Sequence, residues 1–338
     1  MTADSDIDPP WDVERLQGLA RSYQLPLVLL AVLRSGAFER LAAGPATAAE
    51  LANACAVDAG ALSRLLDALV SVGIMERHDQ RYRLPDSLAD GLSSTGIGSP
   101  LDGLKHAAES LDKWSQISEA LARGHAEYTD RLDVTVDAQR NETFIRAMQA
   151  YAGPMAQRFA GLLERRGAER FLDLGGGPGT FSLALLDAWP DLRATIADLP
   201  LTLRITRQVI AEAGVQDRCT LLEADFYKDR ACVLGGPYDL VLISAVIHAE
   251  GEEENRDLFR RVREKVSPGG RIVVRERLLD EDRRGPPRSN LFDVHMLVST
   301  RRGRCYSLSE ISSMLTDAGF VRPRLLSSPD DGFVVADA

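Results

Sequence analysis

The glycine-rich segment at residues 171–180 is the part of this chain best suited to bind a ligand. It reads Phe-Leu-Asp-Leu-Gly-Gly-Gly-Pro-Gly-Thr, an apolar strand that runs directly into a turn with glycines at Gly175, Gly177 and Gly179. Glycines at such a turn let a ligand approach backbone N–H groups that a Cβ atom would block, and the helix that follows presents its partly positive end. We therefore expect a ligand to lie against bare backbone at this turn.

Asp198 narrows the choice of ligand. It closes the next apolar run, residues 194–197, and a carboxylate at the tip of the second strand of a doubly wound sheet holds a ribose hydroxyl pair. The glycines fit G-x-G-x-G, whereas the dinucleotide pattern G-x-G-x-x-G would need a glycine at Thr180. This spacing favours S-adenosylmethionine over a nicotinamide dinucleotide as cofactor. The alternative is that the glycines only form a tight turn between a strand and a helix.

His248 and Glu276 are the residues best placed to move a proton. His248 is one of five histidines and lies one helical turn beyond a predicted strand at 238–244. Glu276 closes a neighbouring predicted strand and could orient the imidazole and stabilise its protonated form. We expect His248 to act as a general base with Glu276 as its support. The alternative is that His248 is a packed or capping residue.

Asp225 and Phe226 follow another predicted strand, at 219–223. Ligands of such a sheet lie outside the carboxyl ends of its strands. Asp225 could therefore accept a hydrogen bond from an adenine amino group, and Phe226 could lie against the adenine ring. An acidic loop beside one core phenylalanine is the alternative.

The elements that position these residues alternate between strand and helix from 166 to 338. Strands are predicted at 170–174, 194–198, 219–223, 238–244, 271–276, 321–326 and 332–336, and helices at 181–186, 201–213, 253–265 and 308–318. Alternation of this kind predicts parallel strands with right-handed crossovers. The fold class is therefore α/β, and residues 166–338 are expected to form a Rossmann-like, doubly wound catalytic domain that binds the cofactor.

A separate module is predicted at residues 12–100, with short helices followed by a strand pair. Thr47 and Glu50 form a capping box, Asp58 can cap the next helix, and a polar turn at 78–80 joins the two strands. This pattern is typical of a winged-helix fold. The helix that would read DNA, residues 59–72, offers only Arg64, so we expect no nucleic acid partner. The apolar segment 16–41 predicts instead a dimerisation surface and a homodimer.

Residues 101–165 form a helical linker between these domains, and their apolar side chains are candidates to line a substrate pocket. The alternative is ordinary core packing. With two residues from the later segment 293–297, the predicted acceptor-binding residues are Trp114, Phe144, Met148, Tyr151, His295 and Met296.

The composition excludes several classes of protein. The 338 residues carry a net charge of −10, which argues against binding nucleic acid through its phosphates. The four cysteines are scattered with no C-x-x-C pair, so we expect neither disulfides nor a zinc site, and no other metal. No uninterrupted apolar run reaches the length of a membrane span, and the N-terminus lacks a signal pattern. We therefore expect a cytoplasmic protein without a membrane partner.

The order of motifs resembles the small-molecule O-methyltransferases of the plant caffeate and bacterial polyketide type. The resemblance covers nearly the whole chain. Its motifs are F-L-D-L-G-G-G-P-G-T, A-D-L-P at 197–200, E-A-D-F at 223–226, I-H at 247–248, S-P-G-G-R-I-V-V-R-E at 267–276, F-I-R-A-M at 144–148, D-V-H-M-L at 293–297, Gly303 and A-G-F at 318–320.

The resemblance implies a residue-level assignment. His248 removes the proton of the substrate hydroxyl, and Glu276 supports it. S-adenosylmethionine is held by the glycine turn and by Asp173, Asp198, Leu199, Asp225, Phe226 and Ser244.

Three segments depart from the family pattern. The chain reads His248-Ala249-Glu250 where the family commonly reads His-Asp-Trp, it has Cys305 near the usual second supporting glutamate, and it carries His295 in the D-x-x-M-L segment.

The predicted function is methyl transfer from S-adenosylmethionine to a phenolic or enolic hydroxyl of a small, secondary-metabolite acceptor, which the sequence does not identify. A first alternative is carbon methylation of a 2-oxo acid with an iron held by His248 and His295. A second is a non-catalytic cofactor-binding or scaffold protein, and a third is a DNA-binding regulator.

Overall fold

A computed structural model of the chain describes residues 10–92, 98–125, 137–326 and 332–338. The chain divides into two compact units, Met1–Thr95 and Gly96–Ala338. Each unit has its own core and is described by itself below.

The N-terminal unit is a set of short helices with a small sheet. Its helices are α1 (Val13–Arg21), α2 (Gln24–Ser35), α3 (Ala37–Ala43), α4 (Ala48–Cys55), α5 (Ala59–Ser71) and α6 (Asp86–Leu92). Its strands, β1 (Ala46–Thr47), β2 (Glu76–His78) and β3 (Arg81–Arg83), form an antiparallel sheet in the order β1-β3-β2. The sequence predicted only the β2–β3 pair, because two residues are too short to give β1 a period.

The predicted helix caps are present in this unit. Glu50 N–H donates to Thr47 Oγ1 over 3.2 Å, Thr47 N–H donates to Glu50 Oε2 over 2.7 Å, and Asp58 caps α5 through Ala61 N–H. The stretch from Val13 to Ser35 keeps large apolar side chains exposed, among them Leu16 and Leu19. This stretch is also long and apolar enough, on average, to cross a membrane, although signal sequences and buried helices pass the same test. Polar residues interrupt the apolar ones there, which is why no membrane span was predicted from the sequence.

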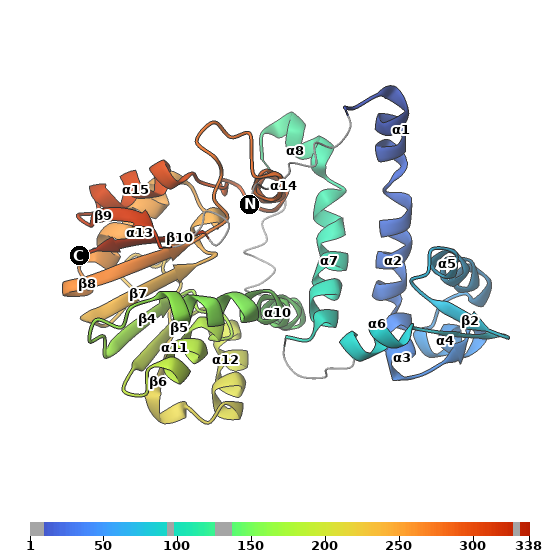
Figure 1. The fold of residues 1–338 in the computed structure, drawn as a ribbon, viewed down its shortest axis with the longest axis horizontal. Helices are drawn as coiled ribbons and strands as arrows, with labels where there is room; N and C mark the ends of the chain where they lie inside the picture. The colour runs from blue at the N-terminus through green and yellow to red at the C-terminus, as the bar shows by residue number, and fades with distance from the viewer. Residues whose placement is uncertain (1–9, 93–97, 126–136, 327–331) are drawn as a thin grey trace, which may run out of the picture. The chain divides into compact units, whose positions relative to one another are not determined.

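The C-terminal unit is a seven-stranded sheet covered by helices (Figure 1). Its strands are β4 (Arg170–Leu174), β5 (Arg193–Asp198), β6 (Cys219–Glu223), β7 (Tyr238–Ser244), β8 (Val266–Arg275), β9 (Val321–Leu325) and β10 (Phe333–Asp337). Its α-helices are α7 (Pro100–Trp114), α8 (Ile117–Arg123), α10 (Ala138–Leu162), α11 (Thr180–Ala188), α12 (Pro200–Glu212), α13 (Glu252–Arg263), α14 (Pro287–Ser299) and α15 (Leu308–Asp317). Two short 3-10 turns, η1 (Gln216–Arg218) and η2 (Ile247–Ala249), precede β6 and α13.

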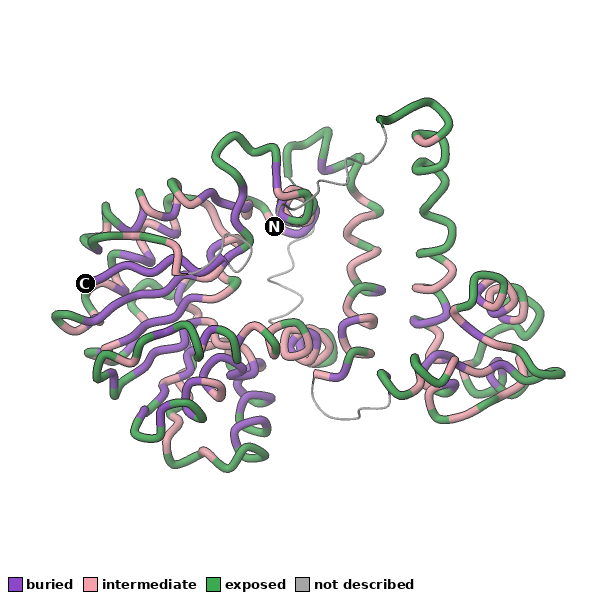
Figure 2. The backbone as a smooth tube through the Cα atoms, viewed as in Figure 1, coloured by how far each residue is buried: buried purple, intermediate pink, exposed green. Residues whose placement is uncertain are grey.

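The sheet buries both of its faces, as Figure 2 shows by the buried strands. Alternate residues of a strand point to opposite faces. In β7, Val241 and Ile243 pack in a core with α13 and α15, whereas Leu240 and Leu242 pack in a second core with α10 and α11. A strand that is buried on both faces needs apolar residues at nearly every position, and the sequence of β7 has them.

The strand order is β6-β5-β4-β7-β8-β10-β9, with β4 to β8 parallel as predicted. The closing pair differs, because β10 inserts between β8 and β9 and runs antiparallel to both. A short connection between β9 and β10 allows only a hairpin, since a parallel crossover needs a dozen or more residues. Strand β8 is also longer than predicted, and it ends at Arg275, directly before Glu276.

Candidate active site

The glycine turn after β4 has the open backbone that the sequence predicted. Gly175, Gly177 and Gly179 all have positive φ, at 72°, 55° and 85°. A Cβ atom at Gly175 would lie 2.5 Å from Cγ2 of Val246, so this glycine is needed for packing. A Cβ atom at Gly177 would meet nothing within 4 Å, so this glycine borders open space. Gly177 is thus the position where a ligand can reach the backbone.

Asp198 is held beside this turn at the end of β5. Its Oδ2 accepts from Gly177 N–H over 2.8 Å, and its Oδ1 accepts from Leu199 N–H over 2.7 Å. Burial raises the pKa of Asp198, and these hydrogen bonds oppose the rise. The structure therefore brings Asp198 and Leu199 to the glycine turn, as the sequence predicted.

Asp173, in the strand before the turn, has an unsatisfied carboxylate oxygen. Its Oδ2 accepts from Ser182 Oγ over 2.7 Å, whereas its Oδ1 is buried without a hydrogen-bond partner. Burial raises its pKa to about 7. An unpaired acidic oxygen beside open backbone suits a ligand with a cationic group, and S-adenosylmethionine carries an ammonium and a sulfonium. The residues present therefore fit this cofactor.

The other predicted cofactor residues lie at neighbouring strand ends. Asp225 accepts from Lys228 N–H over 3.1 Å and follows β6. Phe226 is mostly buried, and its ring lies 3.5 Å from where a Cβ atom would stand at Gly175. Ser244 ends β7, opposite Arg275 of β8. All three are thus near the carboxyl ends of parallel strands, and Phe226 lies directly beside the glycine turn.

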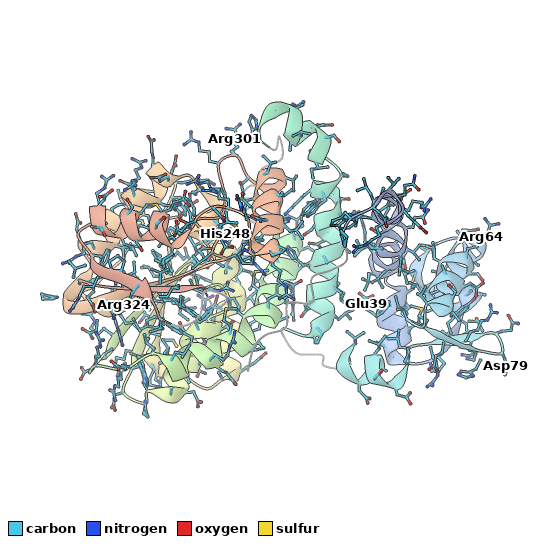
Figure 3. The ribbon with its side chains drawn as sticks, turned by 45° about the horizontal axis from the view of Figure 1, so that its top comes forward. Glu39, Arg64, Asp79, His248, Arg301 and Arg324 are labelled. Atoms are coloured by element: carbon cyan, nitrogen blue, oxygen red, sulfur yellow. The ribbon has the colours of Figure 1, made fainter. Side chains whose placement is uncertain are left out.

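His248, which Figure 3 labels, forms a close pair with Glu276. His248 Nδ1 lies 2.7 Å from Glu276 Oε2, and Glu276 Oε1 accepts from the N–H groups of Val246 and Ile247 over 2.8 and 2.9 Å. Burial alone would raise the pKa of Glu276, but the His248 charge and hydrogen bond, with Arg275 and Val246 N–H, lower it. An ionised Glu276 can only accept, so Nδ1 of His248 carries the hydrogen and Nε2 keeps its lone pair.

Helix α14 brings an aromatic wall to this pair. The Phe292 ring stands edge-on to His248, with centroids 4.9 Å apart, and stacks on His295 at 5.9 Å. His295 stacks in turn on Trp114 of α7 at 6.0 Å. The sequence placed no element at Pro287–Ser299 and did not select Phe292. Its position three residues before His295, on the same helix face, was the available signal.

Both ring nitrogens of His295 already have partners. Trp114 Nε1 donates to Nδ1 over 3.1 Å, and Ser299 Oγ lies 3.4 Å from Nε2. Burial, with the charges of Lys113, His106 and His248, lowers its pKa to about 4, so the ring is neutral. His295 is thus part of the aromatic wall, and its predicted contact with the substrate stays a prediction.

His106 of α7 is a polar residue that the sequence analysis missed. Its ring stands edge-on to Phe144 at 5.4 Å, and its Nδ1 is buried without a hydrogen-bond partner. Burial, then the charge of Lys113, lowers its pKa to about 4. The signal was its rarity, since the chain has five histidines.

The remaining predicted acceptor residues have different surroundings. Met296 is buried on α14, whereas Tyr151 is exposed and donates from its hydroxyl to Gly103 O over 2.9 Å. Phe144 and Met148 are partly buried on α10. Of the six residues predicted to bind the acceptor, Trp114 and His295 belong to the aromatic wall.

Cys305 stands near the place of a second supporting acid. It is buried, and its backbone N–H donates to Asp293 Oδ1 over 2.6 Å. Burial, then the charges of Asp293 and Glu276, raises its pKa to about 12, so it remains a neutral thiol. Cys305 therefore adds no negative charge beside His248.

The described residues contain no group of three His, Cys, Asp or Glu side chains that could hold a metal. His295 also has no free lone pair, because Nδ1 accepts from Trp114 and the neutral ring then carries its hydrogen on Nε2. The described part of the chain therefore contains no set of ligands for the iron that the carbon-methylation alternative requires.

The sheet order, the glycine turn and the acid at the end of β5 define an S-adenosylmethionine-dependent methyltransferase. Residues 114–321 match the profile of the O-methyltransferase domain, and residues 18–89 match that of the O-methyltransferase dimerisation domain. The chain belongs to the O-methyltransferase family. The resemblance seen in the sequence, the fold class and the preference for S-adenosylmethionine are thereby confirmed.

Individual relatives align with this chain over almost its full length. The chain is 30% identical to 3-hydroxy-5-methyl-1-naphthoate 3-O-methyltransferase from Streptomyces sahachiroi, over 95% of this chain and 94% of that one. It is 27% identical to the tetracenomycin polyketide synthesis 8-O-methyl transferase TcmO from Streptomyces glaucescens, over 98% and 97%. The structure of the mitomycin 7-O-methyltransferase MmcR matches with a TM-score of 0.82 and 25% identity, over 96% of each chain. The protein is an S-adenosylmethionine-dependent enzyme that methylates hydroxyl groups of small molecules.

Proposed function

We propose that this enzyme methylates a phenolic or enolic hydroxyl of an aromatic, polyketide-type acceptor, with His248 as general base and Glu276 as its support. The observation that carries the proposal is the 2.7 Å contact between His248 Nδ1 and Glu276 Oε2. This contact holds the imidazole in the tautomer whose Nε2 can take a proton.

The acidity of the acceptor decides which hydroxyls such a base can serve. With a phenol pKa of about 10 and an imidazole pKa of about 6.5, proton transfer is uphill by roughly 5 kcal/mol. S-adenosylmethionine supplies an electrophilic methyl group and a sulfonium charge that favours a developing phenolate by on the order of 3 kcal/mol at about 5 Å and an effective dielectric of about 20. Positioning of the reacting atoms can contribute more than the remainder. An aliphatic alcohol, a much weaker acid, lies outside this range.

The surroundings of His248 support a flat acceptor. Phe292, His295 and Trp114 form a continuous aromatic wall beginning 4.9 Å from the His248 ring. The two named relatives act on 3-hydroxy-5-methyl-1-naphthoate and in tetracenomycin polyketide synthesis. A hydroxylated aromatic ring fits both observations.

We also propose that the enzyme works as a cytoplasmic homodimer that binds neither nucleic acid nor membranes. The exposed apolar side chains of α1 and α2 support a protein contact there. Light scattering should give twice the 36.9 kDa of the monomer. The double variant Leu16→Glu/Leu19→Glu should shift the mass to that of the monomer, whereas Leu121→Glu, at an even more exposed leucine of α8, should not.

A methyl-donor assay over phenolic, polyketide, enolic and 2-oxo-acid acceptors tests the reaction. We expect turnover of phenols and enols, with the new methyl group on oxygen by NMR. A methyl group found on carbon, or a preference for 2-oxo acids, would contradict the proposal.

A further inference from the structure

Four arginines surround one carboxylate where β8, β9 and β10 lie side by side. Asp337 of β10 stands opposite Arg271 of β8 in the strand register. Asp337 Oδ1 accepts from Arg166 over 3.2 Å, and Asp337 Oδ2 lies 3.2 Å from both Arg322 and Arg324. We call these five residues the Asp337 cluster. Both carboxylate oxygens of Asp337 are therefore already paired with the guanidinium groups of three arginines.

Arg271 is the member of the cluster with an unsatisfied guanidinium nitrogen. The residue is only 4% exposed, yet its Nη2 is buried without a hydrogen-bond partner. Burial, then repulsion from Arg166, lowers its pKa to about 10, so the guanidinium remains charged at neutral pH. Buried charges in proteins are normally paired, because an unpaired one loses its hydration without compensation. The carboxylates of Glu164 and Asp337 attract this charge, but neither forms a hydrogen bond with Nη2, which remains unsatisfied.

The charge of the cluster defines the missing group. Arg166 also contacts Glu164, with Nε 3.2 Å from Oε2. Four guanidinium groups against the carboxylates of Asp337 and Glu164 leave a net charge of about +2, in a chain whose overall charge is −10. A dianion would neutralise this local excess.

We propose that the Asp337 cluster binds an oxyanion of the phosphate class, with Arg271 as its buried contact and Arg166 and Arg324 as its outer contacts. The outer side chains are about half exposed, at 47% and 43%, so an arriving ion can reach them and share their guanidinium groups with Asp337. The planar guanidinium fork matches the oxygens of phosphate. The ion can be free phosphate or the phosphate group of a monoester.

This site is separate from the active site. Arg271 lies in β8, and Glu276 follows directly after the last residue of that strand. The separation of five residues between the two positions corresponds to roughly 16 Å at the rise of a strand. Figure 3 shows Arg324 and His248 well apart. Phosphate binding here is therefore independent of the methyl-transfer assignment.

Thermal unfolding of the full chain tests the proposal. Sodium phosphate, glycerol phosphate and sodium chloride are compared at matched ionic strength. We expect the phosphates to raise Tm by about 2 °C or more at ten times Kd, and chloride not to do so. A larger shift with glycerol phosphate than with phosphate would identify a monoester as the ligand, and an equal or smaller shift would identify the free ion.

Variants separate specific binding from charge screening. Arg271→Met should abolish the phosphate response while leaving Tm without phosphate equal or higher, because methionine removes a buried guanidinium with an unsatisfied nitrogen. Arg324→Gln, at a half-exposed position, should weaken phosphate binding about 5-fold or more by calorimetry. Arg301→Gln, an exposed arginine elsewhere, is the matched control and should respond as the wild type does. An equal Tm shift in chloride, or an undiminished phosphate response in Arg271→Met, would overturn the proposal.

Discussion

The indole N–H of Trp114 donates to Nδ1 of His295 over 3.1 Å and thereby joins α7 to α14. Because indole nitrogen can only donate, this bond fixes the lone pair of His295 on Nδ1. The imidazole is thus neutral and held in one orientation, stacked between Trp114 and Phe292. This hydrogen bond therefore restrains the imidazole within the wall beside His248.

Trp114→Phe should loosen this wall without removing its apolar surface. The buried Nδ1 of His295 would lose its donor, which costs about 1–3 kcal/mol. We expect KM for the acceptor to rise several-fold, while the Kd of S-adenosylmethionine stays unchanged. In a double-mutant cycle with His295→Ala the two effects should be non-additive. Full additivity would show that the hydrogen bond does not couple the two residues.

His248→Ala and Glu276→Gln should each lower kcat by about 10²-fold or more. The first removes the proton acceptor, and the second removes the charge that holds Nδ1–H. Calorimetry should show that S-adenosylmethionine still binds. His78→Ala, an exposed histidine of β2, serves as the matched control and should keep full activity. Wild-type turnover in both variants would show that His248 is not the base.

Asp173 makes the stability of the unliganded chain dependent on pH. Its pKa is about 7 in the folded state, against 3.8 for an ordinary aspartate, so the folded state holds the proton more tightly. Stability from this group is present at acid pH and is lost as pH rises from about 4 to about 7. Asp173→Asn should therefore raise Tm at pH 8 by several degrees and change it little at pH 4, when measured by calorimetry without cofactor.

The same Asp173→Asn variant should bind S-adenosylmethionine at least about 10-fold more weakly, because it lacks the acidic oxygen. Asp79→Asn, in the exposed turn between β2 and β3, is the control for a lost charge and should change neither property. Equal Tm differences at both pH values would contradict the assignment of the raised pKa.

Gly177→Ala separates backbone strain from a lost binding surface. The new Cβ meets nothing within 4 Å, so the chain should fold with a loss of only about 1 kcal/mol from the positive φ of 55°. Because that space is where the cofactor is expected, its Kd should rise about 10-fold or more. Gly214→Ala has a similar φ of 68° and open surroundings, and it should lose stability alone. Unchanged cofactor binding in Gly177→Ala would place the ligand elsewhere.

Local sequence signals were sufficient for the central sheet and for the residues at its strand ends. Val241 and Ile243 alternate with Leu240 and Leu242 because the strand is buried on both faces, and a run of this kind is visible without a structure. The turn at Gly175 and the close pair of His248 and Glu276 follow from the same parallel topology, which brings strand ends together.

The rest of the site depends on contacts between distant segments. Helix α14 was not predicted, because its sides are covered by residues such as Trp114, 181 positions before His295. The spacing of apolar residues in 287–299 does not reveal which distant residues will cover this helix. The antiparallel β10 and the unsatisfied nitrogen of Arg271 likewise depend on neighbours that only the folded chain supplies.

Val246 connects the glycine turn to the pair of His248 and Glu276. Its side chain closes against Gly175, and its N–H is held by Glu276, which also holds the imidazole of His248. One residue thus contacts both the turn proposed to hold the methyl donor and the acid that orients the proposed base. Substitutions that resize position 246 should therefore alter donor binding and proton removal together.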